Sequence, residues 1–96
     1  MYVKVHRHDG EVIVAACDDD VKGKTFAGDG KKITVNESFY GVRTMDEETF
    51  INTMRSATIM NLVGDGVIGL AIAHGFVSKD TVIQIGDVSH VQVVVM

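Results

Sequence analysis

The stretch TMDEETFINTMRSATIMNLVGDGVIGLAIAHG, from Thr44 to Gly75, is the part of the chain that is long and apolar enough to organise a core. Its first half predicts a helix. Thr44 followed three residues later by Glu47 spells a capping box, which satisfies unpaired N–H groups of a first helical turn. Beyond it, the side chains that share one helical face by their three- and four-residue spacing are Phe50, Ile51, Met54, Ala57, Thr58, Asn61 and Leu62.

The second half of this stretch predicts a second helix, which is buried. Gly64-Asp65-Gly66 interrupts the pattern, and from Val67 apolar residues run almost all round a helix that closes at Gly75. We therefore expect a central pair of helices. An extended strand leading into Gly64 beside parallel neighbours would contradict this interpretation.

Both ends of the chain predict β-hairpins. Asp9-Gly10 separates two β-like runs and is a strong hairpin signal, because both central positions of a type I′ turn need a positive φ. The resulting register places Val5 opposite Val14, with the valine face toward the core. Residues 81–85 and 88–96 form the corresponding C-terminal hairpin, and residues 31–35 form a further strand before a short helical turn that Asn36 caps.

The order of these elements predicts the α+β class. The 96 residues suffice for a single small domain, residues 1–96, whose helices and strands share one core. We expect a mostly antiparallel sheet, built from the N- and C-terminal hairpins and packed against the central helix pair.

The composition excludes several classes of protein. Hydrophobic residues make up 46% and charged residues 23% of the chain, which is typical of a folded domain and not of a disordered one. A net charge of −4 argues against nucleic-acid binding through a general basic field, although a local basic patch stays open. Cys17 is the only cysteine, which fits a reducing compartment. No apolar run approaches the roughly 20 residues of a membrane span, so we expect a soluble, cytoplasmic protein.

Two glycine-rich motifs raise the alternative of a small nucleotide- or phosphate-binding protein. Gly64 to Gly69 spells G-x-G-x-x-G with Asp87 downstream, but that fingerprint needs a preceding strand and βαβ units. Gly23-Lys24-Thr25 is similar to the end of a P-loop, but the acidic run Asp18-Asp19-Asp20 occupies the loop and would repel phosphate. We therefore expect no cofactor.

Metal binding and catalysis have weaker support. His6 and His8 share one side of a predicted strand, and the hairpin register puts Glu11 opposite His8 as a third ligand. Exposed histidines at a hairpin end are the plainer explanation, so no metal site is assigned. Cys17 lies in an apolar strand and indicates a buried thiol. Since no nucleophile is paired with a histidine, we expect no catalytic residues.

Polar side chains within apolar elements are candidates for binding. Asn61 interrupts an apolar face next to a glycine-rich turn, although a satisfied core amide is the commoner case. His90 and Gln92 share one face of the last strand, where they are either ordinary solvent-facing groups or recognition groups. Tyr40 and Arg43 flank Gly41 and form either a stacking pair for a base or partner side chain, or a plain surface turn.

Blocks distributed over the whole chain resemble a known family. They are MYVKVHRHDGEVIVAACD at the start, GKTF at residues 23–26, FYG at 39–41, ATIMNLVG at 57–64 and HVQVV at 90–94. They are similar to a family of small archaeal proteins filed as domain of unknown function 424. The resemblance implies a stand-alone cytoplasmic archaeal protein without established enzymatic activity, in a role linked to RNA or translation. The positions that it carries over are Lys24, Thr25, Tyr40, Asn61, His90 and Gln92.

We therefore expect a non-catalytic binding module for RNA, or for a ribonucleoprotein or other protein partner. The candidate binding residues are Lys22, Lys24, Thr25, Tyr40, Arg43, Asn61, His90 and Gln92. Besides a monomer, a homodimer joined through the valine-rich terminal strand is an alternative, because an open strand edge invites pairing.

Overall fold

The chain folds into short strands and short helices, and the longest helix that the structure describes has 9 residues. The computed structural model describes residues 1–95. The elements are β1 (Tyr2–His8), β2 (Glu11–Cys17), β3 (Thr25–Gly28), β4 (Lys31–Thr34), α1 (Glu37–Tyr40), α2 (Glu47–Met54), β5 (Ile59–Val63), α3 (Asp65–Ala73), a 3₁₀ turn η1 (Lys79–Thr81), β6 (Ile83–Ile85) and β7 (Val88–Val94).

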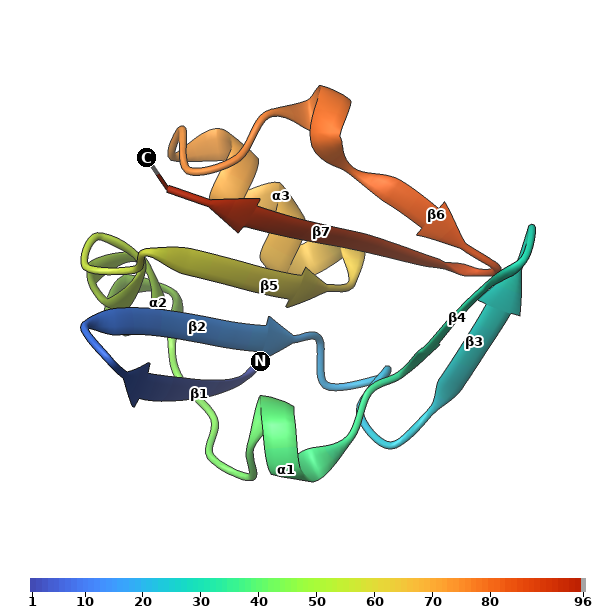
Figure 1. Ribbon diagram of the computed structural model, residues 1–96, viewed down its shortest axis with the longest axis horizontal. Coiled ribbons are helices and arrows are strands. Elements are labelled where there is room, and N and C mark those ends of the chain that lie inside the picture. Colours follow the sequence, from blue (N-terminus) through green and yellow to red (C-terminus); the bar gives the residue numbers. More distant parts are fainter. Residues whose placement is uncertain (96) are drawn as a thin grey trace.

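One sheet of five strands forms the centre of the fold, in the order β1-β2-β5-β7-β6, while β3 and β4 pair separately (Figure 1). All neighbours in the large sheet are antiparallel except β2 and β5, which are parallel. Figure 1 shows α2 and α3 behind this sheet. The predicted α+β class with a mostly antiparallel sheet is confirmed. Within residues 1–95, no helix has the length and apolar character that crossing a membrane requires.

The N-terminal hairpin has the predicted register. Asp9 and Gly10 have φ angles of 48° and 81°, so both central residues of the turn adopt the positive φ that a type I′ turn requires. Val5 lies opposite Val14. A pairing one residue out of step would have turned the valine face away from the helices.

The C-terminal hairpin and the short helix α1 also form. The last strand ends at Val94 and not at residue 96 as predicted, and residue 96 lies outside the described residues. Ile85 lies opposite Val88 across the Gly86-Asp87 turn, although the first strand begins only at Ile83, because the chain makes the 3₁₀ turn before it. Asn36 caps α1, since its side chain accepts a 2.8 Å hydrogen bond from Phe39 N–H. The strand expected at residues 31–35 ends one residue earlier. Its partner β3 was not predicted.

The central stretch differs from the predicted helix pair. The side chain of Asp46, and not of Thr44, caps α2, because Asp46 Oδ1 accepts a 2.8 Å hydrogen bond from Thr49 N–H. The helix ends at Met54. The residues that were expected to continue its apolar face instead form β5, the middle strand of the sheet.

The wrong prediction for residues 57–63 has a physical reason. Met60 and Leu62 are buried, while Ile59 and Asn61, which alternate with them, are partly exposed. This alternation is the two-residue period of a strand. A central strand has core on both faces, so its short apolar run cannot be distinguished from a buried helix by periodicity alone.

The structure therefore has an extended strand leading directly into Gly64. On one side β5 has a parallel neighbour, β2, as in a nucleotide-binding unit, but on the other side β7 is antiparallel. α3 follows at Asp65–Ala73, and Val67, Ile68 and Ala71 are its buried residues. Gly69 and Ala73 are exposed, so the helix is not buried all round as predicted.

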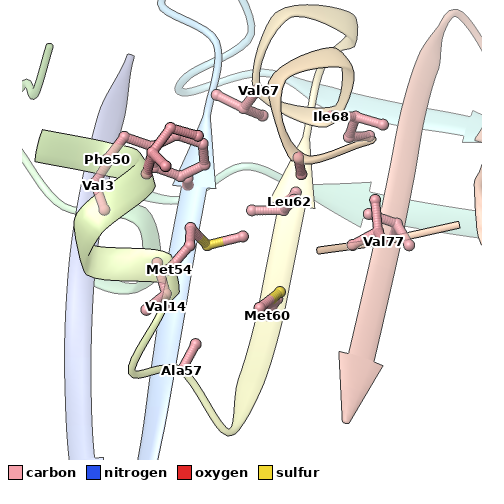
Figure 2. Packing of buried hydrophobic residues seen from close by; sticks show 14 residues of the cluster. Val3, Val14, Phe50, Met54, Ala57, Met60, Leu62, Val67, Ile68 and Val77 are labelled. Carbon is pink, nitrogen blue, oxygen red and sulfur yellow. The ribbon is translucent and has the colours of Figure 1, made fainter. Parts of the chain in front are cut away.

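The main hydrophobic core lies between the sheet and the helices α2 and α3. Phe50 and Met54 of α2 extend toward Val14 of β2, and Val67 and Ile68 of α3 lie beside Leu62 of β5 (Figure 2). Phe50 is fully buried. The central strands β2 and β5 thus receive both helices on one face.

A second, smaller core covers part of the opposite face of the sheet. Ala15, Cys17 and Val63 of the sheet contact Tyr40 of α1 and Val35, which follows β4. Burial raises the pKa of the Cys17 thiol to about 11, so this thiol stays protonated and unreactive at neutral pH. Because this cover is small, the rest of this face is left open.

Candidate functional site

A line of polar side chains crosses the open part of the sheet. The hydroxyl of Tyr40 donates a 2.6 Å hydrogen bond to Oδ1 of Asn61 on β5. Asn61 lies opposite Gln92 on β7, and its Nδ2 lies 3.5 Å from Gln92 Oε1. Burial raises the pKa of the Tyr40 phenol, so this hydroxyl remains a donor at neutral pH. Three residues that the sequence singled out separately therefore meet on one surface.

His90 lies on the same face of β7, two residues before Gln92. Its Nδ1 is 3.0 Å from the carbonyl oxygen of Leu62. Burial lowers the pKa of His90 from its ordinary 6.5, and the hydrogen bond to Leu62 opposes this shift only in part. The imidazole is therefore neutral at pH 7 and carries its proton on Nδ1, which leaves Nε2 as a hydrogen-bond acceptor.

We expect the stability of the protein to fall in mildly acidic solution because of His90. The folded chain holds this imidazole neutral at pH values where the unfolded chain protonates it, so protons favour unfolding. The free energy of unfolding should decrease as the pH falls below 6.5 and this decrease should level off below the lowered pKa. Urea unfolding as a function of pH measures it, and a His90→Gln variant with the same slope as the wild type would contradict the assignment.

We define the open face as the part of the sheet that α1 and the β3–β4 hairpin leave uncovered. Its members follow from the register of β2, β5, β7 and β6, which aligns them in rows. They are Ile13, Ile59, Asn61, Ile83, His90, Gln92 and Val94. Val94 is 58% exposed and Ile83 40% exposed. None of these seven side chains carries a formal charge when His90 is neutral. Glu11, which is exposed and lies two residues before Ile13 on the same face of β2, adds one carboxylate at the rim.

Lys22, another predicted binding residue, is occupied elsewhere. Its Nζ lies 3.9 Å from the centroid of the Tyr2 ring and 3.8 Å from the carboxylate of Glu37. The side chain is only 16% exposed. Lys22 therefore links the start of β1, through a cation–π interaction with Tyr2, to α1, through its ion pair with Glu37.

The remaining candidates belong to two other regions. Lys24 and Thr25 lead into β3, where Thr25 Oγ1 lies 3.0 Å from Thr34 Oγ1. Arg43 is exposed and lies beside the edge of β1, where its carbonyl oxygen accepts a hydrogen bond from Val3 N–H. None of these contacts involves a residue of the open face, so the eight predicted binding residues do not form one surface.

The three weak metal candidates are each held by other groups. His6 Nε2 is 2.8 Å from the carbonyl oxygen of Phe39, and the two rings stack at 4.9 Å. His8 pairs with the carboxylate of the neighbouring turn residue at 3.0 Å. Glu11 accepts a hydrogen bond from the hydroxyl of Thr58 at 2.5 Å. Across residues 1–95, no three histidine, cysteine, aspartate or glutamate residues gather closely enough to hold a metal ion.

The glycine-rich turn between β5 and α3 binds a carboxylate that the chain itself supplies. Asp18 follows β2, the parallel neighbour of β5, and its side chain accepts hydrogen bonds from Gly66 N–H at 2.8 Å and Val67 N–H at 2.9 Å. A helix N-terminus of this kind attracts phosphate in nucleotide-binding folds. Here the Asp18 carboxylate takes the place that a phosphate oxygen would occupy.

The glycines of the motif make room for this carboxylate. Gly64 has a φ of 111°, and a Cβ placed on it would collide with the Asp18 side chain. A Cβ on Gly66 would lie 2.7 Å from Asp18 Oδ1, whereas one on Gly69 would meet nothing within 4 Å. The motif thus has the local geometry of a dinucleotide fingerprint but is already filled. The second motif, Gly23-Lys24-Thr25, leads into a strand and not into the helix that a P-loop requires.

The sequence of residues 6–96 matches the family described as protein of unknown function (DUF424). The chain belongs to this family. Among solved structures, its fold is similar to the crystal structure of an uncharacterized conserved protein from Methanopyrus kandleri. The TM-score is 0.83 at 22% sequence identity, over 99% of this chain and 90% of that chain, so the likeness concerns the fold. A comparison with curated proteins gives no match.

In this DUF424 protein, sequence reasoning missed two features of the candidate site. It identified the polar members of the open face but not the aliphatic ones, which are Ile13, Ile59, Ile83 and Val94. It also did not assign Asp18 as the group that binds the N-terminus of α3. The signal for both lay in the pairing of β2 with β5, which places Ile13 beside Ile59 and Asp18 beside Gly64.

Proposed function

We propose that this DUF424 protein is a cytoplasmic, non-catalytic binding module that docks on a partner protein through its open face. The observation that carries the proposal is the uncovered part of the central sheet. There, exposed and half-buried aliphatic side chains surround uncharged amide and imidazole groups, and Glu11 at the rim supplies one carboxylate. Apolar surface with a few fixed polar groups is the composition typical of the centre of a protein interface.

The lack of cations among the open-face residues favours a protein over RNA as the partner. RNA binding derives much of its affinity from cations that neutralise phosphates. The lysines and the arginine predicted to do this do not contact the open face, and Lys22 is engaged by Tyr2 and Glu37. Tyr40, the aromatic residue predicted to stack on a base, is only 3% exposed and so offers no face to one.

A role without catalysis is supported by the state of the reactive groups. The phenol of Tyr40 is hydrogen-bonded to Asn61, and the thiol of Cys17 is buried with a raised pKa. His90 uses Nδ1 for the carbonyl of Leu62 and has no hydroxyl or thiol bonded to its other nitrogen among residues 1–95. These groups are arranged to fix the geometry of a surface, which is what a recognition site requires.

The proposal is tested by capturing partners from cells that naturally produce the protein. We expect a Gln92→Lys/Val94→Lys variant to lose a protein that the wild type retains, because two cations would be forced against an uncharged, desolvated interface. Both side chains are exposed, so the fold should not change. Asn52→Lys/Ser56→Lys, which makes the same change in net charge at two exposed positions on and just after α2, is the matched control and should retain that protein.

Two outcomes would contradict the proposal. If nuclease treatment releases the captured material, RNA and not protein is the ligand. If sedimentation shows a dimer that the open-face variant dissociates, the surface joins two copies of the chain. A homodimer joined through the edge of β7 stays a prediction, because β6 pairs only with Val88–His90 and, within residues 1–95, the rest of β7 has no strand neighbour on that side.

A further inference from the structure

The edge of the sheet at β1 is only partly paired. Residues 43–45 lie along its first half, where Val3 N–H donates to Arg43 O at 3.1 Å and Met45 N–H donates to Met1 O at 3.1 Å. Since backbone groups alternate in direction along a strand, Val5 and Arg7 present their N–H and C=O groups to the same side as Val3. Within residues 1–95, neither has a backbone partner on that side.

A groove follows this edge. It has a volume of about 790 Å³ and runs between β1 and the segment that connects α1 to α2. Val3, Val5, Val42 and Met45 supply apolar lining, and Val42 is 59% exposed. The groove therefore offers an apolar floor next to unpaired strand backbone, which is the combination that receives an extended peptide by strand addition.

The edge is basic although the chain as a whole is acidic. Lys4 and Arg43 line the groove, and Arg7 follows on the same strand. None of the three forms an ion pair within residues 1–95. Glu37 is the acidic residue that lines the groove, and its carboxylate lies 3.8 Å from Lys22 Nζ. In a protein of net charge −4, three uncompensated cations along one strand edge attract an acidic ligand.

We propose that the β1 edge is a docking site for an acidic segment of a partner protein, which binds in an extended conformation and adds a strand beside Val5 and Arg7. The backbone of the segment pairs with the free N–H and C=O groups of β1. Acidic side chains of the segment that share the face of Val5 and Arg7 contact Arg7 and Arg43. The alternate side chains are apolar and enter the groove beside Val42. This surface is separate from the open face, so either proposal can fail without the other.

The probe for this site is a short peptide in which glutamate and valine alternate. In an extended strand it presents carboxylates to the face that carries Arg7 and Arg43, and valines to the other face, beside Val42. Titration into the isotope-labelled protein should shift the amide resonances of β1 and of residues 41–45. Arg7→Glu/Arg43→Glu should weaken binding about tenfold, because two attractive charge contacts become repulsive. Affinity should also fall as salt is raised.

The controls separate this site from general attraction of charge. Arg55→Glu/Lys79→Glu makes the same change in net charge at two exposed positions on other elements, and it should leave the affinity unchanged. A peptide alternating lysine and valine should not bind. Equal weakening in both double variants, shifts spread over other strands, or no binding of the glutamate peptide would overturn the proposal. So would a dimer in sedimentation that Arg7→Glu/Arg43→Glu dissociates, since a second copy would then occupy the edge.

Discussion

Replacing Gly64 with alanine is expected to lower the free energy of unfolding by about 4 kcal/mol. The residue has a φ of 111°, which alanine adopts only under strain, and its new methyl group would collide with the carboxylate of Asp18. Displacing that carboxylate breaks its hydrogen bonds to Gly66 and Val67 and leaves two N–H groups of the α3 N-terminus unsatisfied. Urea unfolding followed by circular dichroism measures the loss.

The same motif supplies the matched control. Gly69 lies inside α3 with open space around the position of a Cβ, so Gly69→Ala should raise the free energy of unfolding by about 0.5–1 kcal/mol. The two substitutions differ only in position within Gly64–Gly69. Equal and small effects of both would mean that Asp18 does not fill the turn, and would return the nucleotide-binding alternative to consideration.

Replacing Phe50 with alanine is expected to cost about 4 kcal/mol, within the range for a large core aromatic. Its ring is fully buried between α2 and the sheet and belongs to the core that holds both helices. Val14 and Leu62 of the same core belong to central strands of the sheet, which limits how far the site can collapse around the lost ring. Thermal and urea unfolding should report a single weakened transition.

Phe39 on α1 provides the comparison for the other face of the sheet. It stacks on His6 and is only partly buried, so Phe39→Ala should cost about 1–2 kcal/mol. A larger effect for Phe39 than for Phe50 would contradict the assignment of the main core to the helix side. It would place the dominant packing beneath α1 and the β3–β4 hairpin.

Elements that depend on local chemistry could be predicted from the sequence. Asp9-Gly10 determined both the turn and the register of the first hairpin, and Asn36 marked the start of α1. In each case the signal and the structure that it specifies are separated by a few residues. The central strand β5 could not be predicted in this way, because its environment is created by β2 and β7, which are distant in sequence.

The polar residues of the candidate site could be predicted from the sequence, but their arrangement could not. Tyr40, Asn61, His90 and Gln92 could be singled out because each is a polar residue in an apolar or turn context. Their convergence depends on the β5–β7 pairing and on the position of α1 over the sheet, which a single sequence does not reveal. Lys22 shows the converse, since a cation that looked available for a ligand is held by Tyr2 and Glu37.

The parallel contact between β2 and β5 also sets the order in which the chain can assemble. Each terminal hairpin closes through a tight turn and can form early from residues adjacent in sequence. β5 can join β2 only after residues 18–58 have looped back, which makes this the contact with the greatest entropic cost of closure. Because β5 separates the two hairpins, the halves of the sheet remain unconnected until that one short segment arrives, and cooperativity between the ends of the chain begins there.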